Sequence, residues 1–180
     1  MRSKIVALGS LLALAGALLP AGARADEAAN QKLMMRFYDE VCNQQKIGMI
    51  DELVAPDFVD HDTSSGFPPN REGLKQFFQT MYVAFPDMKF NPEYMVAKDD
   101  RVLWYGTMTG TQKGPMMGMP ATNKSVTVNI FDMVRFANGK AVEHWGIADA
   151  MSLMMQMGMM PEHPGMGEKD KMGGGMGGGH

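Results

Sequence analysis

The spacing of apolar residues changes along the chain from a helical period to alternation. In the first half, apolar side chains recur every three or four positions in three stretches, which predicts three helices. These are residues 28–45, a short helix that carries Ile50 and Leu53 and ends at Pro56, and a helix that Asn70 caps and Pro86 closes. Three N-terminal helices are therefore expected to pack one apolar face each.

The second half is rich in valine, threonine and aromatic residues separated by turn signals. Residues 94–97, 101–109, 125–136 and 140–147 are predicted as strands. Asn138-Gly139 suits a two-residue hairpin turn, because both positions of that turn favour a positive φ. Asp149 is expected to cap a last helix over 150–157 that stops at Gly158. The order predicts an α+β domain in which helices cover one face of a curved antiparallel sheet and leave an internal pocket.

Strand alternation divides the side chains of the last two strands between two faces. Val142, His144 and Gly146 share one face of the last strand, and Glu143 and Trp145 share the other. On the preceding strand, the face with Asp132 also carries Val128, Ile130 and Val134. The sequence leaves open which face is concave.

The N-terminus has the features of a secretory signal. Arg2 and Lys4 precede an apolar run over residues 5–19, and Ala23-Arg24-Ala25 is a small-x-small cleavage site. We therefore expect residues 1–25 to be a signal peptide, residues 26–161 the domain, and the protein to be periplasmic or secreted. The apolar run is shorter than a membrane-spanning helix needs, so no membrane association is expected after cleavage.

The net charge and the cysteine content limit which partners and which disulfide bonds are expected. The 180-residue chain has 17 basic and 20 acidic residues, and cleavage after Ala25 would leave 14 basic against 20 acidic. An acidic domain binds the phosphate backbone poorly, so nucleic acid is not an expected partner. Cys42 is the only cysteine, so no disulfide can form within one chain. Exposed sheet edges favour a homodimer.

A series of short motifs, in order and in register over residues 30–161, resembles the SnoaL-like polyketide cyclase family, also called ester cyclases. The motifs are Asp57-Phe58-Val59-Asp60-His61-Asp62, Arg71-Glu72-Gly73, Ala84-Phe85-Pro86-Asp87, Asp100-Arg101-Val102, Thr109-Gly110-Thr111 to Gly118-Met119-Pro120, Arg135-Phe136-Ala137-Asn138-Gly139-Lys140 and Glu143-His144-Trp145. The resemblance implies the nuclear-transport-factor-2-like fold, a cone of curved sheet with a ligand cavity. It also implies aldol ring closure by acid–base catalysis without a metal or cofactor.

The sequence departs from the family at one position of the implied site. In the family, an aspartate two residues after the last-strand histidine is the acid/base; here His144 matches the histidine, but Gly146 stands at the aspartate position. The residues that remain for acid–base chemistry are Asp132 or His144, with His61 at the pocket mouth. The predicted pocket residues are Phe77, Trp104, Val128, Ile130 and Gly146. The expected ligand is an apolar small molecule that bears a carbonyl group.

The C-terminal residues 162–180 are glycine-spaced and rich in methionine and histidine, which predicts a disordered tail. Thioether sulfur is a soft ligand that suits Cu(I). The candidate ligands are Met159, Met160, His163, Met166, Met172, Met176 and His180. Methionines before Gly158 are equally explained as core or lid residues. Three functions therefore remain open: a cyclase-like enzyme, a noncatalytic ligand-binding module, and a copper- or silver-binding protein that acts through its tail.

Overall fold

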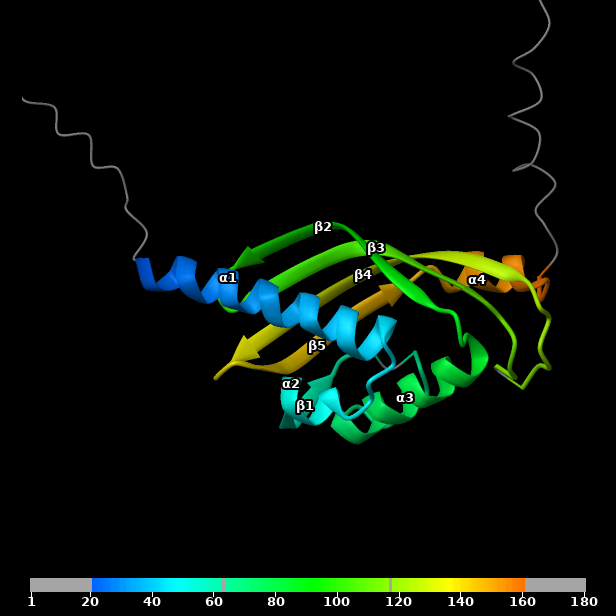
Figure 1. Ribbon diagram of the computed structural model, residues 1–180, viewed down its shortest axis with the longest axis horizontal. Helices are drawn as coiled ribbons and strands as arrows, with labels where there is room; N and C mark the ends of the chain where they lie inside the picture. Colours follow the sequence, from blue (N-terminus) through cyan, green and yellow to red (C-terminus); the bar gives the residue numbers. More distant parts are fainter. Residues whose placement is uncertain (1–20, 63, 117, 161–180) are drawn as a thin grey trace, which may run out of the picture.

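The computed structural model describes residues 21–62, 64–116 and 118–160, which form a sheet wrapped around helices (Figure 1). The helices are α1 (Ala21–Arg36), the π-helix η1 (Phe37–Asn43), α2 (Met49–Leu53), α3 (Arg71–Ala84) and α4 (Ala150–Met157). The strands are β1 (Val54–Asp60), β2 (Lys89–Lys98), β3 (Arg101–Thr111), β4 (Ser125–Ala137) and β5 (Lys140–Ala148). The predicted α+β class is confirmed.

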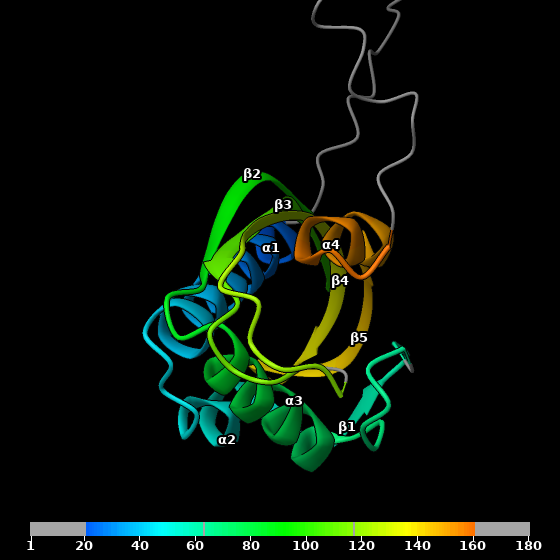
Figure 2. The same cartoon turned by 90° about the vertical axis from the view of Figure 1, so that its right-hand side faces the viewer.

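The five strands form one mixed sheet in the order β1-β5-β4-β3-β2. Strands β2 to β5 are an antiparallel meander, and β1 joins the edge of β5 in parallel. Viewed end-on, the sheet curls over α1 and α3, and these helices lie within the curve (Figure 2). The sheet thus has a concave face toward the helices and an outer face.

The structure confirms the predicted helix caps and the predicted hairpin turn. The Asn70 side chain accepts a hydrogen bond from the Gly73 amide (3.0 Å), and Asp149 accepts one from Ser152 (2.9 Å). Gly158 ends α4 with φ +77°. The hairpin between β4 and β5 turns at Asn138 and Gly139, both with positive φ, as the Asn-Gly pair predicts.

The short second helix ends earlier than predicted, and a strand follows it. α2 stops at Leu53 because Val54 is already extended, with φ −114° and ψ 136°. Pro56 therefore lies inside β1 rather than closing a helix, which is tolerated because β1 is an edge strand. Pairing of β1 with β5 places Asp60 opposite His144.

Strand β2 begins five residues before the predicted start at Tyr94. A proline at position 92 cannot donate a ladder hydrogen bond, so the sequence marks it as a break. In the structure, the register between β2 and β3 shifts between Pro92 and Tyr94, and this irregularity lets the strand continue through the proline. The sheet is consequently longer at this edge than the sequence indicated.

A second irregularity lies in the β4–β5 hairpin. Phe136 pairs with Ala141, whereas Arg135 pairs with Glu143, so Val142 is an extra residue in β5. Beyond this bulge, Asp132 pairs with Gly146 and Val134 with His144. Asp132 and His144 therefore lie on the same face of the sheet.

Candidate active site

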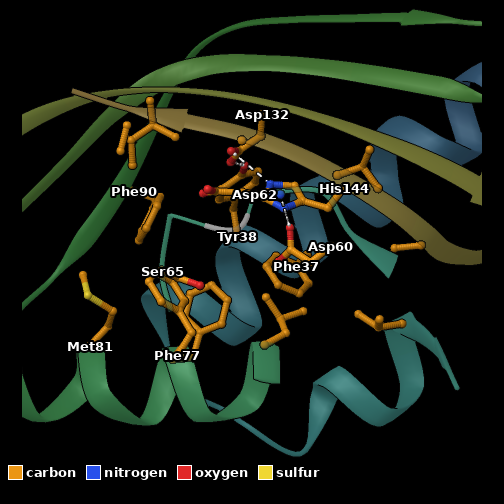
Figure 3. A pocket seen from close by; sticks show the side chains of 18 of the residues that line it. Phe37, Tyr38, Asp60, Asp62, Ser65, Phe77, Met81, Phe90, Asp132 and His144 are labelled. Carbon is orange, nitrogen blue, oxygen red and sulfur yellow. Dashed lines mark hydrogen bonds and ion pairs between the residues drawn. The ribbon is translucent and has the colours of Figure 1, made fainter. Parts of the chain in front are cut away.

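The helices and the concave face of the sheet enclose a cavity of about 230 Å³. Its walls are mostly apolar: α3 contributes Phe77, Phe78 and Met81, and the facing strands contribute Val128 and Ile130. Carboxylate and imidazole groups gather at one end (Figure 3). Such an apolar pocket with a few convergent polar groups is typical of a small-molecule site.

At that polar end, His144 is held between two carboxylates. Its Nδ1 lies 2.9 Å from Oδ1 of Asp60, and its Nε2 lies 3.2 Å from Oδ1 of Asp132 (Figure 3). The three side chains come from β5, β1 and β4. Their side chains are 14–20% exposed, so water screens these contacts only partly.

The two carboxylates keep His144 charged. Burial alone lowers the pKa of an imidazole, but hydrogen bonds and charge attraction from Asp132 and Asp60 outweigh it and raise the pKa of His144 to about 10. The site therefore holds an imidazolium at neutral pH. This ion can donate protons in hydrogen bonds from both ring nitrogens but cannot act as a base.

Tyr38 provides a further polar group at the same end. Its hydroxyl donates a hydrogen bond to Oδ2 of Asp132, and its ring stacks on Trp104 at 4.2 Å between centroids. Burial and the nearby charge of Asp132 raise the pKa of the Tyr38 phenol well above its ordinary value. Tyr38 belongs to the π-helix η1, a conformation that often occurs at functional sites.

Gly146 leaves the space in which His144 meets Asp132. A Cβ at this position would lie 2.7 Å from Cε1 of His144 and 2.9 Å from Oδ1 of Asp132. Real Cβ atoms do not approach neighbours this closely, so any side chain here would displace one of the two groups. The absence of a side chain at position 146 thus allows His144 and Asp132 to contact each other.

Most predicted site residues line the cavity, but two do not. Asp132, His144, Phe77, Val128, Ile130 and Gly146 all line it. Trp104 is fully buried behind Tyr38 and is absent from the lining, so it supports the wall rather than forming it. His61 was expected at the pocket mouth; its ring instead stacks on Trp145 at 4.4 Å and its Nε2 lies 3.1 Å from Glu143. Trp145 and Glu143 share the outer face of β5, which explains why His61 is outside the cavity.

Sequence reasoning missed three polar groups of the site: Tyr38, Asp60 and Asp62. Tyr38 falls within the apolar helical pattern of residues 28–45, and a tyrosine in such a pattern is not distinguishable from a core residue. Asp60 could have been found only by recognising β1, since its parallel pairing brings Asp60 to His144. Asp62 lines the cavity two residues later.

The predicted copper ligands fall mostly outside the described residues. Met159 and Met160 follow α4, whereas His163, Met166, Met172, Met176 and His180 lie beyond residue 160. Among the described residues, no cluster of three or more His, Cys, Asp or Glu side chains could hold a metal ion. Over the same part of the chain, no helix has both the length and the apolar character that crossing a membrane requires. Copper binding by the tail stays a prediction, as does the signal peptide.

A curved sheet around a cavity, with acid–base groups at one end, defines a small-molecule-binding protein of the cone-shaped α+β type. The model of the SnoaL-like polyketide cyclase family matches residues 32–157, and the chain belongs to this family. The predicted family and its nuclear-transport-factor-2-like fold are therefore confirmed. No curated protein matches the chain.

Solved structures agree with this assignment. IdmH from Streptomyces antibioticus is 30% identical, with a TM-score of 0.64, and the match covers 72% of this chain and 98% of IdmH. AclR from Streptomyces galilaeus is 25% identical, with a TM-score of 0.68, covering 77% of this chain and 87% of AclR. TsrD from Streptomyces laurentii is 22% identical with a TM-score of 0.67, covering 74% and 97%, and shows the fold alone.

Proposed function

We propose that this protein is a cofactor-free acid–base enzyme that abstracts a proton next to a carbonyl group of an apolar small molecule, in an aldol-cyclase or isomerase reaction. The observation that carries the proposal is the ring of His144 held between Asp60 and Asp132 at the polar end of an apolar cavity. Membership of a polyketide cyclase family supports it.

The roles follow from the charge state of each group. Asp132 is the base, because His144 is already protonated at neutral pH and the phenol of Tyr38 keeps its proton. A C–H bond of the substrate breaks, its proton moves to Asp132, and its electron pair moves to the carbonyl oxygen as an enolate. Tyr38 and His144 then turn their hydrogen bonds from Asp132 to the enolate oxygen, which stabilises the developing charge. In a cyclase reaction the enolate carbon attacks a second carbonyl, and the new alkoxide takes the proton back from Asp132.

Asp60 is a positioning residue in this scheme. Its Oδ1 accepts a hydrogen bond from Nδ1 of His144, on the side of the ring away from Asp132. The same oxygen also accepts a hydrogen bond from the backbone amide of Asp62 (3.0 Å). It therefore fixes the imidazole plane and helps to keep the ring charged. It does not need to touch the substrate.

The lining also indicates the charge of the ligand. Among the described residues of the cavity wall there are three carboxylates, Asp60, Asp62 and Asp132, and a single cation, His144. No lysine or arginine of the described chain lines the cavity. An anionic ligand would meet net repulsion there, so the proposed substrate is a neutral carbonyl compound.

The test is the proton-abstraction step itself, which needs no knowledge of the natural substrate. Exchange of the α-hydrogens of an apolar ketone such as 2-tetralone with D₂O is followed by proton NMR, with and without the protein. We expect saturable, catalysed exchange that falls at least about 100-fold in Asp132→Asn and His144→Gln. His61→Gln is the matched control, since His61 lies on the outer face, and should keep the wild-type rate.

The alternative is a noncatalytic binding module on the same cone. It is favoured by the internal pairing of every donor at the polar end, since His144 and Tyr38 bond only to protein carboxylates. Ketones that bind in the cavity without catalysed exchange would establish this alternative and overturn the enzyme proposal. Unchanged exchange in both Asp132→Asn and His144→Gln would overturn the mechanism.

A further inference from the structure

Asp62 is the cavity carboxylate that the proposed mechanism does not use. The charge of His144 is shared by Asp60 and Asp132, which both form ion pairs with its ring. His61 stacks on the outer face, and no lysine or arginine of the described chain lines the cavity. Within the described part of the cavity wall, Asp62 is therefore a carboxylate without a cation of its own.

The position of Asp62 is fixed from two sides. Its backbone amide donates to Oδ1 of Asp60 (3.0 Å), and its own Oδ1 accepts a hydrogen bond from the amide of Ser64 (2.9 Å) and another from the Ser64 hydroxyl. Ser64 and Ser65 are exposed and also line the cavity, so this segment lies at the opening of the cavity (Figure 3). Asp62 thus stands between the opening and the acid–base groups.

The second oxygen of Asp62 is available to a ligand. No group of residues 21–62, 64–116 or 118–160 donates a hydrogen bond to its Oδ2, whereas both oxygens of Asp132 accept one. An ionised carboxylate can accept hydrogen bonds but cannot donate them. When an apolar ligand displaces water from this wall, Oδ2 loses its hydration unless the ligand itself supplies a donor.

We propose that Asp62 is a specificity-determining residue that binds a hydroxyl group of the substrate. This inference rests on the proposed function, in which the carbonyl oxygen of the substrate lies at Tyr38 and His144. A hydroxyl group elsewhere on the same molecule then donates to Oδ2 of Asp62. A hydroxyl is favoured over an ammonium group, because moving a full charge from water to apolar walls costs more. The substrate class is therefore a neutral hydroxyketone.

The size of the cavity indicates which compounds can test this. A cavity of about 150 Å³ is large enough to hold benzene. The cavity of this protein measures about 230 Å³, which leaves room for a second ring fused to the first. Derivatives of 2-tetralone with one substituent on the aromatic ring are therefore suitable probes.

The test compares hydroxyl with methoxy derivatives of 2-tetralone at each of the four aromatic positions, by isothermal titration calorimetry of the full chain. A methoxy group accepts a hydrogen bond but cannot donate one. At one position or more, the wild type should bind the hydroxyl compound at least about tenfold more tightly than the methoxy compound, because a hydrogen bond to a charged group is strong.

Asp62→Asn should abolish this preference and keep the local structure. The variant retains Oδ1 and hence the bonds from Ser64, but an amide group that donates replaces the accepting Oδ2. The ratio of the two affinities should fall below about twofold, and the affinity for unsubstituted 2-tetralone should change less than about twofold.

Two control variants should keep the wild-type preference. Asp57→Asn makes the same chemical change on β1, where Asp57 is exposed and is not part of the cavity lining. Ser65→Ala removes another hydroxyl that lines the cavity. The Ser65 hydroxyl can donate to a methoxy oxygen as well as to a hydroxyl, so it does not distinguish the two compounds. Circular dichroism shows whether each variant is folded.

Equal affinity for hydroxyl and methoxy compounds at all four positions in the wild type would overturn the proposal. A preference that persists in Asp62→Asn, or one that Asp57→Asn also removes, would overturn it as well. Exchange of α-hydrogens, measured on the same samples, separates this inference from the proposed function. A hydroxyl preference without exchange overturns the enzyme proposal alone, whereas exchange without a hydroxyl preference overturns only the role of Asp62.

Discussion

Asp132 and Gly146 pair directly across β4 and β5, and the carboxylate of Asp132 occupies the space into which a side chain at 146 would project. The carboxyl group that the family resemblance places at position 146 is thus replaced by one on the neighbouring strand. It lies 3.2 Å from His144 Nε2. The glycine at position 146 therefore does not remove the carboxylate from the neighbourhood of His144.

Gly146→Ala should therefore damage the site while leaving the fold. The new Cβ would force His144 and Asp132 apart, so we expect α-hydrogen exchange to fall about 10- to 100-fold, with an unchanged circular dichroism spectrum. Gly48→Ala is the control, because nothing lies within 4 Å of a Cβ at that position. Equal exchange rates in the two variants would contradict the role given to Gly146.

His144 should also stabilise the folded protein, because it neutralises two partly buried carboxylates. Replacing it with alanine leaves Asp60 and Asp132 without their cation and should lower the free energy of unfolding by about 3 kcal/mol at pH 7. Urea unfolding measures this change. His61→Ala breaks a solvent-accessible pair with Glu143 and should lower the free energy of unfolding much less than His144→Ala does. Similar losses in both variants would mean that the two partly buried pairs of His144 stabilise the fold no more than the pair of His61 with Glu143.

The raised pKa of His144 predicts a specific pH dependence. The imidazole binds its proton more tightly in the folded state, with a pKa of about 10, than in the unfolded state, where it is near 6.5. Its stabilisation is therefore fully present below pH 6.5 and is lost as the pH rises toward 10. Urea midpoints should fall between pH 7 and 9.5 in the wild type more steeply than in His144→Gln. An NMR titration that shows His144 losing its proton near pH 6.5 would contradict the assignment.

Tyr38 and Tyr82 allow a catalytic hydroxyl to be separated from a structural one. Both are partly or fully buried, but Tyr38 donates to Asp132 at the cavity, whereas Tyr82 donates to the carbonyl of Val41 (2.6 Å). Tyr38→Phe should slow α-hydrogen exchange about 10- to 100-fold, and each substitution should cost about 1–2 kcal/mol of stability. Tyr82→Phe should keep its exchange rate. A loss of exchange in Tyr82→Phe alone would reverse the assignment.

Copper binding by the methionine-rich tail can be tested apart from the domain. Titration of the full chain with Cu(I) against a competing chelator should show tight binding. Replacing Met166, Met172 and Met176 with leucine should weaken it at least tenfold and leave ketone exchange unchanged. Equal Cu(I) affinity of the two proteins would end this hypothesis.

The fold class was predictable because its signals are local. Asn70, Asp149 and Asn138-Gly139 each bond or turn within a few residues, so their effect can be read from a short window of sequence. β1 was not predictable in this way. Its seven residues follow a helix directly and contain a proline, and only pairing with β5, some 80 residues away, makes them a strand.

The candidate site also contains residues that local sequence signals predict and residues that only long-range contacts bring together. His144 and Asp132 share a face by alternation along two adjacent strands, and this much followed from the sequence. Asp60 and Tyr38 reach the site through contacts across 84 and 94 positions of the chain. Such contacts leave no periodic signal. The position of His61 differs from the prediction for a related reason: it directly follows Asp60, the last residue of β1, and its side chain points to the opposite face.

The bulge at Val142 determines the face on which His144 lies. If Val142 paired with Arg135 instead of bulging out of the ladder, the register of Phe136 with Ala141 would continue, and His144 would pair with Met133 on the outer face. Trp145 and Glu143 exchange faces with it under the same shift. In that regular ladder the indole of Trp145 would face the cavity and the imidazole of His144 would face solvent, although the sequence would be unchanged. Deleting Val142 would instead remove the bulge and keep Val134 opposite His144, so the site depends on Val142 remaining unpaired and not on its side chain.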